Sequence, residues 1–155
     1  MKWLGMSADY VMAHPIEAVW EFVSNVENMG RWVEGVKEPK WASDDEHGVG
    51  SAFTSHYQYA GKIHDLEYEV TASEPLSKFA TKSTAGRFPY QGTITIESVN
   101  GGTKVTHDMM AGSDGAITAF MFTVGGVFFR PMMRKRLRKE LETMSQEIEK
   151  DSQSN

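Results

Sequence analysis

Two histidines are the side chains of this sequence best suited to acid–base chemistry, because an imidazole changes its charge near neutral pH. His64 alternates with Leu66 and Tyr68, and His107 stands two residues after Val105, so each lies on an apolar face of an expected strand. If those faces turn inward, His64 or His107 can act as a general acid or base in an enolisation or aldol cyclisation, with Tyr68 orienting a carbonyl group. The structural alternative is a neutral histidine that is hydrogen-bonded to a tyrosine hydroxyl or a backbone carbonyl. The sequence leaves both interpretations open.

Other kinds of catalytic or metal site find little support. The chain has no cysteine, which excludes disulfides, thiolate nucleophiles and thiolate metal ligands. No pair of histidines has the HxH or HExxH spacing of a zinc site, and the acidic loop at 44–47 is expected to be solvated. Neither a GxSxG nucleophile elbow nor a glycine-rich phosphate loop occurs. We therefore predict no metal and no cofactor.

The segment from Ala116 to Met133 has the most unusual composition, since it is rich in Phe and Met and uncharged until Arg130. It is too short and too rich in Gly and Thr to span a bilayer, which takes about 20 apolar residues. One interpretation is a core helix. The other is an adaptable cavity wall that moves to admit a ligand, since methionine is flexible and Gly125-Gly126 removes side-chain volume. The residues that would share one side of a straight helix are Ile117, Phe120, Met121, Val124, Val127 and Phe128.

Length and charge narrow the class of protein. A chain of 155 residues with 40% hydrophobic and 24% charged residues is typical of one globular domain. A formal net charge of −5 disfavours nucleic acid as a partner. The start of the chain lacks the pattern of a signal peptide, so we expect a cytoplasmic protein.

The hydrophobic periodicity changes twice along the chain. A strand at 7–13 is followed by a helix at 14–25 that begins at Pro15, and then by a second short helix at 26–35. A period of two then predicts six strands, the first of which contains Pro39 and should lie at a sheet edge. The expected ranges of these strands are 36–43, 51–61, 62–75, 77–86, 90–99 and 103–112.

A long helix is expected after Asp114. Its apolar residues recur at helical spacing and form one ridge, made of Met133, Leu137, Leu141, Met144 and Ile148. This helix is the only element long enough to cover the apolar face of the sheet. Its basic stretch at 130–139 is interpreted as a solvated face balanced by Glu140, Glu142 and Glu147, and contact with anionic lipid head groups is the less favoured alternative.

Three stretches together resemble the START/polyketide cyclase–dehydrase superfamily. They are "HPIEAVWEFVSNVENMGRWVEGV", "GGTKVTH" and "GGVFFRPMMRKRLRKELETMSQEIE", and the resemblance extends from about Ser7 to Ile148. It implies an α+β helix-grip fold, in which a curved seven-stranded antiparallel sheet, two short N-terminal helices and a long C-terminal helix enclose a cavity. The expected domain covers residues 1–150, with a frayed tail at 151–155.

The resemblance also implies a cavity that takes a hydrophobic small molecule such as a lipid or polyketide. The first functional hypothesis is therefore a binder or carrier of such a ligand. The second is a cyclase/dehydrase-type enzyme that uses His and Tyr, and the third is a protein-partner regulator of the chaperone-activator type. Ligand identity and oligomeric state stay open. The expected ligand-binding residues are Phe53, Tyr57, Tyr59, His64, Leu66, Tyr68, Ile94, Ile96, His107, Met109, Ile117, Phe120, Met121, Val124 and Phe128.

Overall fold

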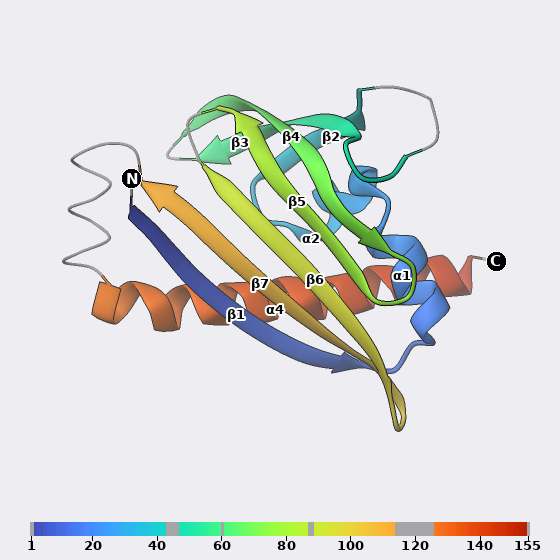
Figure 1. The fold of residues 1–155 in the computed structure, drawn as a ribbon. Helices are drawn as coiled ribbons and strands as arrows, with labels where there is room; N and C mark the ends of the chain where they lie inside the picture. The colour runs from blue at the N-terminus through green and yellow to red at the C-terminus, as the bar shows by residue number, and fades with distance from the viewer. Residues whose placement is uncertain (1, 43–46, 60, 87–88, 114–125, 155) are drawn as a thin grey trace.

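A seven-stranded antiparallel sheet lies across one long helix in the computed structural model, which describes residues 2–42, 47–59, 61–86, 89–113 and 126–154 (Figure 1). The order of the strands in the sheet is β1-β7-β6-β5-β4-β3-β2. The fold is therefore the α+β helix-grip arrangement that the resemblance implied. The strands are β1 (Lys2–Met12), β2 (Val36–Trp41), β3 (Ala52–Tyr59), β4 (Lys62–Glu74), β5 (Lys78–Ala85), β6 (Tyr90–Val99) and β7 (Gly102–Ser113).

The helices occupy the two positions that the sequence predicts. Between β1 and β2 lie α1 (Ile16–Val23), a 3-10 turn η1 (Val26–Asn28) and α2 (Met29–Trp32). The predicted second short helix is thus divided into η1 and α2. The long helix α4 (Gly126–Gln153) runs through Pro131 without interruption and includes the first three residues of the expected tail, 151–153.

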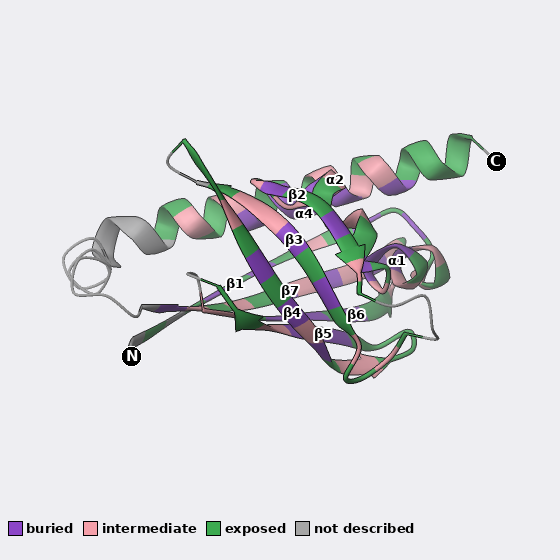
Figure 2. Cartoon of the chain, turned by 90° about the horizontal axis from the view of Figure 1, so that it is seen from above, coloured by how far each residue is buried: buried purple, intermediate pink, exposed green. Residues whose placement is uncertain are grey.

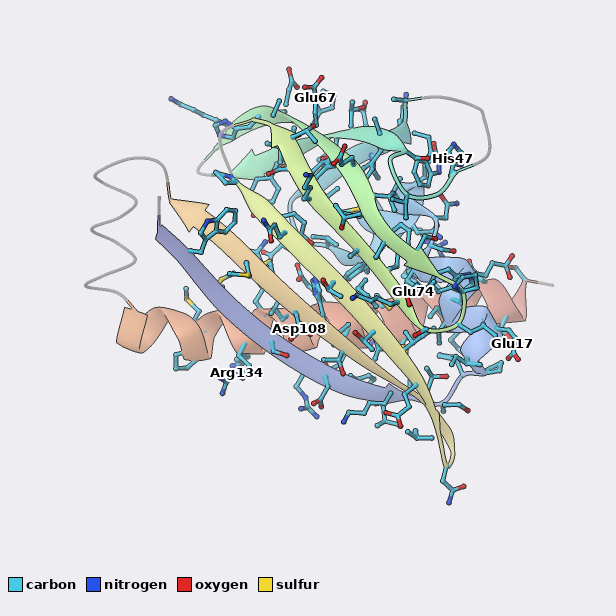
Figure 3. The ribbon with its side chains drawn as sticks, viewed as in Figure 1. Glu17, His47, Glu67, Glu74, Asp108 and Arg134 are labelled. Carbon is cyan, nitrogen blue, oxygen red and sulfur yellow. The ribbon has the colours of Figure 1, made fainter. Side chains whose placement is uncertain are left out.

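Alternating burial gives the sheet one inner and one outer face (Figure 2). In β7, Val105 and His107 are buried, whereas Asp108 is exposed on the outer face (Figure 3). In β4, Leu66, Tyr68 and Val70 are buried, as their alternation with charged residues predicts. The inner face is consequently apolar and needs a cover.

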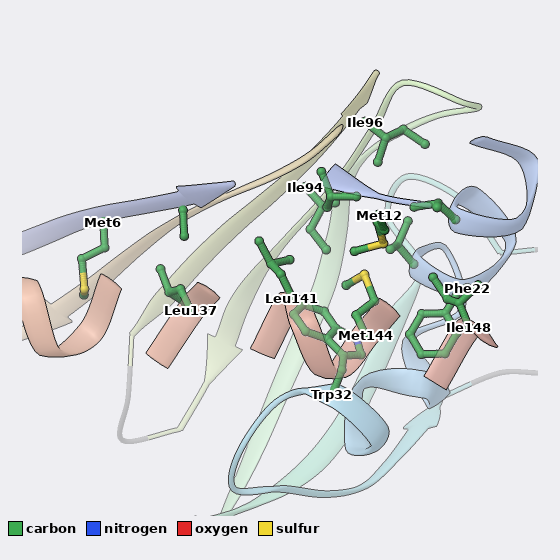
Figure 4. Close-up of a cluster of buried hydrophobic side chains, with 14 residues drawn as sticks. Met6, Met12, Phe22, Trp32, Ile94, Ile96, Leu137, Leu141, Met144 and Ile148 are labelled. Carbon is green, nitrogen blue, oxygen red and sulfur yellow. The ribbon is translucent and has the colours of Figure 1, made fainter. Parts of the chain in front are cut away.

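The helix α4 supplies this cover with its predicted apolar ridge. The four residues Leu137, Leu141, Met144 and Ile148 are buried against Met6, Met12, Ile94 and Ile96 of the sheet (Figure 4). Met133, the fifth residue of the ridge, packs against the same cluster. A second cluster, built around Phe53, Leu66, Tyr68 and Phe79, fills the part of the fold near η1.

Polar contacts also tie α4 to the segment that contains α2. Arg31 donates hydrogen bonds to Glu147 Oε1 at 3.0 Å and to Asp151 Oδ1 at 2.8 Å, and its guanidinium lies 5.0 Å from the centre of the Phe22 ring. His14 Nε2 lies 2.9 Å from the carbonyl oxygen of Ser145. These contacts fix the C-terminal half of α4 against the N-terminal helices.

The sheet edge formed by β2 has the features that Pro39 predicts. The pairing of β2 with β3 shifts register between Lys37 and Lys40, and Glu38 within this bulge has a φ of 49°. Gly35, just before β2, has a φ of 89°, where a Cβ atom would lie 2.9 Å from the Tyr57 ring. Within the described residues, no helix is long and apolar enough to cross a bilayer.

Candidate functional site

The inner face of the sheet brings most of the predicted strand residues together. The buried ones are Phe53, Leu66, Tyr68, Ile94, Ile96 and His107. The half-buried ones are Tyr57, His64 and Met109. The register places Phe53 opposite Tyr68, and His107 opposite Ile94. His64, opposite Tyr57 near the end of β4, lies at the margin of this group.

Six predicted ligand-binding residues lie wholly or in their side chains outside the part of the chain that the structure describes. Ile117, Phe120, Met121 and Val124 lie outside the described residues, as do the side chains of Tyr59 and Phe128. The hypothesis of a movable segment at the cavity entrance rests on this part of the chain. The cavity between the sheet and α4 and its mobile wall therefore stay predictions.

His107 has the most distinctive environment on the inner face. The residue is only 3% exposed to solvent. The Trp32 ring meets it edge-on, with ring centres 5.6 Å apart. Among the buried side-chain nitrogen and oxygen atoms of the described residues, only His107 Nδ1 has no hydrogen-bond partner. Burial lowers the pKa of His107 to about 4, with the Asp108 carboxylate opposing this shift, so the ring is neutral at pH 7.

A neutral imidazole with an unpaired nitrogen is a ready hydrogen-bonding partner. It accepts or donates at Nδ1 according to its tautomer. An unpaired buried polar atom costs about 1–3 kcal/mol, and a ligand group that pairs with it recovers this energy. The structural alternative stated for His107, a hydrogen bond to a tyrosine hydroxyl or backbone carbonyl, is not made at this nitrogen.

Tyr68 lies in the second cluster and already has a partner. Its hydroxyl is 3.1 Å from Ser55 Oγ, and its ring stacks on Phe53 with centres 4.7 Å apart. Burial raises the pKa of Tyr68, while the hydrogen bond with Ser55 opposes the rise. Tyr68 is therefore a neutral phenol whose hydroxyl group is already hydrogen-bonded.

Tyr90 was not among the predicted residues, although it belongs to the same face. Its ring folds over Gly92, so a Cβ atom built at Gly92 would collide with the phenol oxygen. Its ring also meets Tyr68 edge-on at 6.3 Å. Burial raises the pKa of Tyr90, and the charges of Tyr68 and Glu140 raise it further. The sequence signal for Tyr90 was Gly92, two residues further along the same central strand. A glycine inside a strand often marks a place where another group comes close to the backbone.

Glu140 of α4 is the second residue that sequence reasoning missed, and it corrects the interpretation of that helix as a solvated face. Its exposure is only 6%, and its Oε2 accepts a hydrogen bond of 2.8 Å from the Glu34 backbone N–H. Arg136 Nε lies 3.6 Å from the same carboxylate. Burial raises the pKa of Glu140 to about 7, against the opposing effect of the Glu34 N–H and the Arg136 charge.

The neighbouring Arg136 is half-buried and joins α4 to two other segments. It donates hydrogen bonds to the Tyr57 hydroxyl at 3.1 Å and to the Glu34 carbonyl at 3.0 Å. A signal for both residues was present, because Arg136 follows Met133 by three positions and Glu140 follows Leu137 by three. Both therefore stand beside the apolar ridge. The exposed Arg134, Lys135, Arg138 and Lys139 fit the solvated interpretation.

Two hollows are found away from this face. One, of about 380 Å³, is lined mainly by outward residues of β2 to β5 such as Thr54, His56 and Asp65. The other, of about 230 Å³, lies between α1 and the β4–β5 turn and is lined by Trp20 and Trp41 among others. No group of metal-ligating side chains is found among the residues that the structure describes.

The family can be assigned from the sequence match. Residues 6–149 match the model of the family described as polyketide cyclase/dehydrase and lipid transport. The chain belongs to this family. The match covers nearly the whole chain and agrees with the resemblance drawn from the three sequence stretches. Among curated proteins, none matches the chain significantly by sequence.

Solved structures of other proteins share the fold at low sequence identity. The structure of TTHA0849 from Thermus thermophilus has a TM-score of 0.77 at 16% identity, covering 96% of this chain and 99% of that one. The Zhui aromatase/cyclase from a Streptomyces species has a TM-score of 0.67 at 15% identity, covering 96% and 94%. A Staphylococcus aureus protein of unknown function has a TM-score of 0.72 at 12% identity, covering 98% and 97%. At these identities the likeness shows the fold alone.

Proposed function

We propose that this protein binds a hydrophobic small molecule, such as a lipid or polyketide, in a cavity between the inner face of the sheet and α4. The observation that carries the proposal is the unpaired Nδ1 of the buried, neutral His107. Apolar side chains of β6 and α4 surround this part of the face and would exclude water from an oily guest. Membership of a family whose description includes lipid transport and polyketide chemistry supports the same ligand class.

His107 would give such a guest its orientation. A hydroxyl group on an otherwise apolar molecule would donate a hydrogen bond to an unprotonated Nδ1. In the other tautomer, Nδ1–H would donate to a carbonyl or hydroxyl oxygen of the ligand. The neutral ring disfavours a carboxylate at this position, because no positive charge is available there at pH 7. The expected ligand is therefore uncharged where it meets His107.

The test begins with native mass spectrometry of the gently purified protein, which should show a co-purified lipid or polyketide. The affinity of the extracted ligand is then measured for the wild type, His107→Phe and the control His56→Phe. His56 lies on the outer face, where its Nδ1 is 2.7 Å from Asp65. The loss of one neutral hydrogen bond should weaken binding by His107→Phe about 5- to 10-fold, with no change for His56→Phe. Equal affinities for all three proteins would contradict the proposal.

A second candidate, a cyclase/dehydrase-type enzyme, is favoured by Glu140. A buried carboxyl group with a pKa of about 7 can accept a proton from a carbon next to a ketone and return it elsewhere. His107 is a poorer base, because its pKa of about 4 leaves it little affinity for a proton. Glu140→Gln should abolish turnover of a poly-β-ketone substrate yet retain binding if this candidate is right. Unchanged turnover would exclude Glu140 as the base.

A further inference from the structure

The two edges of the sheet are built in opposite ways. The β2 edge is six residues long and is interrupted by the register shift at Lys37/Lys40 and by Pro39, which has no N–H. The β1 edge is eleven residues long, contains no proline, and keeps continuous register with β7 from Lys2 to Met12. The strand β1 lies at one edge of the sheet, with β7 as its only neighbour in the strand order, and Figure 1 shows α4 in the layer behind it. Among the residues that the structure describes, only the β2 edge therefore carries the usual protection against further strand pairing.

The hydrogen bonds of β7 show which groups of β1 face outward. Gly112 N–H donates to the Pro89 carbonyl at 2.8 Å, on the side of β6. The backbone N–H and C=O groups of successive residues in a strand point to opposite sides. The odd-numbered residues of β7 therefore direct their N–H and C=O groups toward β1. His107 is opposite Ala8, so the even-numbered residues of β1 bond to β7. The odd-numbered residues therefore direct their N–H and C=O groups to the free edge.

The outward side chains of β1 are unusual for a solvent-exposed strand. Trp3 and Val11 are 41% and 54% exposed, and both stand on the outer face near opposite ends of β1. Between them lie Gly5, Ser7 and Asp9, so this strand carries one charged residue on its outer face. An exposed, regular strand flanked by large apolar side chains is suited to pairing with another strand.

We propose that the β1 edge is the interface at which two copies of this chain pair, antiparallel, about Ser7. Ser7 is the midpoint of β1, so this register pairs the strand along its full length. It places Trp3 of one copy opposite Val11 of the other, and Gly5 opposite Asp9. Both exposed apolar residues are thereby covered, and no charged residue meets a like charge.

The register also satisfies the hydrogen-bonding geometry. In every pair of outer-face residues both members are odd-numbered, so their outward N–H and C=O groups face each other. The two seven-stranded sheets would join into one continuous sheet with both α4 helices on the same side. This inference does not rest on the proposed ligand.

The proposed dimer has a two-fold axis at Ser7, so Ser7 of one copy lies opposite Ser7 of the other. This symmetry makes the test specific. Ser7 is exposed, so its substitution should leave the fold intact, which circular dichroism checks. The wild type should have twice the 17.4 kDa chain mass in sedimentation equilibrium. Ser7→Lys and Ser7→Glu should each weaken the dimer by roughly 5-fold or more, because like charges would then lie directly opposite.

Mixing the two variants should restore a dimer that contains one copy of each. Thr54→Lys, which adds the same charge to an exposed position of β3, should behave as the wild type. A monomeric wild type would overturn the proposal. So would a dimer that neither Ser7 variant weakens, or two weakened variants that do not recover on mixing.

Discussion

At the scale of single residues, His107 and Glu140 are two buried ionisable groups whose pKa values shift in opposite directions and cross. Burial favours the neutral form of each, which lowers the pKa of the imidazole to about 4 and raises that of the carboxyl group to about 7. Between about pH 4 and pH 7, His107 and Glu140 are therefore both mainly neutral. Because the two shifts have opposite effects on the pH dependence of folding, each is best measured in a variant that removes it.

The first prediction concerns His107→Phe. The folded pKa lies below the ordinary value of 6.5, so His107 lowers the free energy of unfolding as the pH falls from about 6.5 to 4. This loss should amount to roughly 3 kcal/mol in the wild type, since one pKa unit corresponds to about 1.4 kcal/mol. Urea unfolding across this pH range should show the loss in the wild type and in His56→Phe, but not in His107→Phe. A parallel pH dependence of the wild type and His107→Phe would be evidence against a buried neutral imidazole.

The second prediction concerns Glu140→Gln. The folded pKa lies above the ordinary value of 4.5, so the stabilisation from Glu140 is complete below about pH 4.5 and is lost as the pH rises through 7. Glu140→Gln should lack this loss of roughly 3 kcal/mol, as followed by urea unfolding between pH 4.5 and 8. Glu142→Gln, on the exposed side of α4, serves as the control. Identical slopes for Glu140→Gln and the wild type would mean that the carboxyl group is solvated.

The sequence predicted part of this site at the residue scale. The alternation around His107 and Tyr68 predicted that each lies on an apolar face of a strand, because a strand has a period of two, and the structure shows that both are buried. It could not show that Tyr68 is paired with Ser55 whereas His107 Nδ1 is unpaired, since such pairing depends on contacts between strands. Glu140 was missed because charge was taken to indicate exposure, although its position beside the ridge indicated burial.

At the scale of secondary-structure elements, β6 contains a local device that shapes the inner face. Gly92 leaves room in the middle of the strand, and the Tyr90 ring of the same strand occupies it. Tyr90 is held at its backbone by Ser83 Oγ, which accepts a hydrogen bond of 2.9 Å from the Tyr90 N–H. The position of the phenol within the face thus depends on a missing side chain two residues away.

The third prediction tests this pair with a double-mutant cycle. Gly92→Ala should lower the free energy of unfolding by roughly 1–3 kcal/mol, because the new Cβ collides with the end of the Tyr90 side chain. In the Tyr90→Ala background the same substitution should cost much less, which gives a coupling energy of about 1 kcal/mol or more. Additive effects in chemical denaturation would show that the Tyr90 ring does not occupy the space above Gly92.

Element boundaries were predicted best where one face is apolar and the other polar. The period of two predicted all six strands from β2 to β7, and their predicted ranges agree with the structure to within two residues at each end. β1 begins at Lys2, five residues earlier than predicted. Trp3 and Gly5 on its outer face break the expected alternation, so the pattern did not indicate a strand there. This departure is the same feature that the proposed pairing of two β1 strands would explain.

At the scale of the whole molecule, the fold follows from one apolar sheet face that needs one long amphipathic cover. The ridge of α4 and the inner residues of the sheet were both visible in the sequence, so an antiparallel sheet covered by a C-terminal helix could be predicted, and the family resemblance implied the helix-grip fold. The volume between the sheet and α4 could not be predicted from the sequence, because it depends on how closely α4 approaches the sheet. Family membership adds the class of ligand to this architecture but leaves the particular guest open.

The most direct test of the central claim uses the methionines as reporters of which face binds a hydrophobic molecule. Met6, Met12 and Met144 are buried on the inner side, and Met109 is half-buried there, whereas Met110 is exposed on the outer face. The measurement is methyl NMR of methionine-labelled protein titrated with the fluorescent probe 1-anilinonaphthalene-8-sulfonate. Binding between the sheet and α4 should shift the methyl signals of Met109 and its inner neighbours and leave Met110 unchanged. Shifts at Met110 with the inner methionines unchanged would contradict the account.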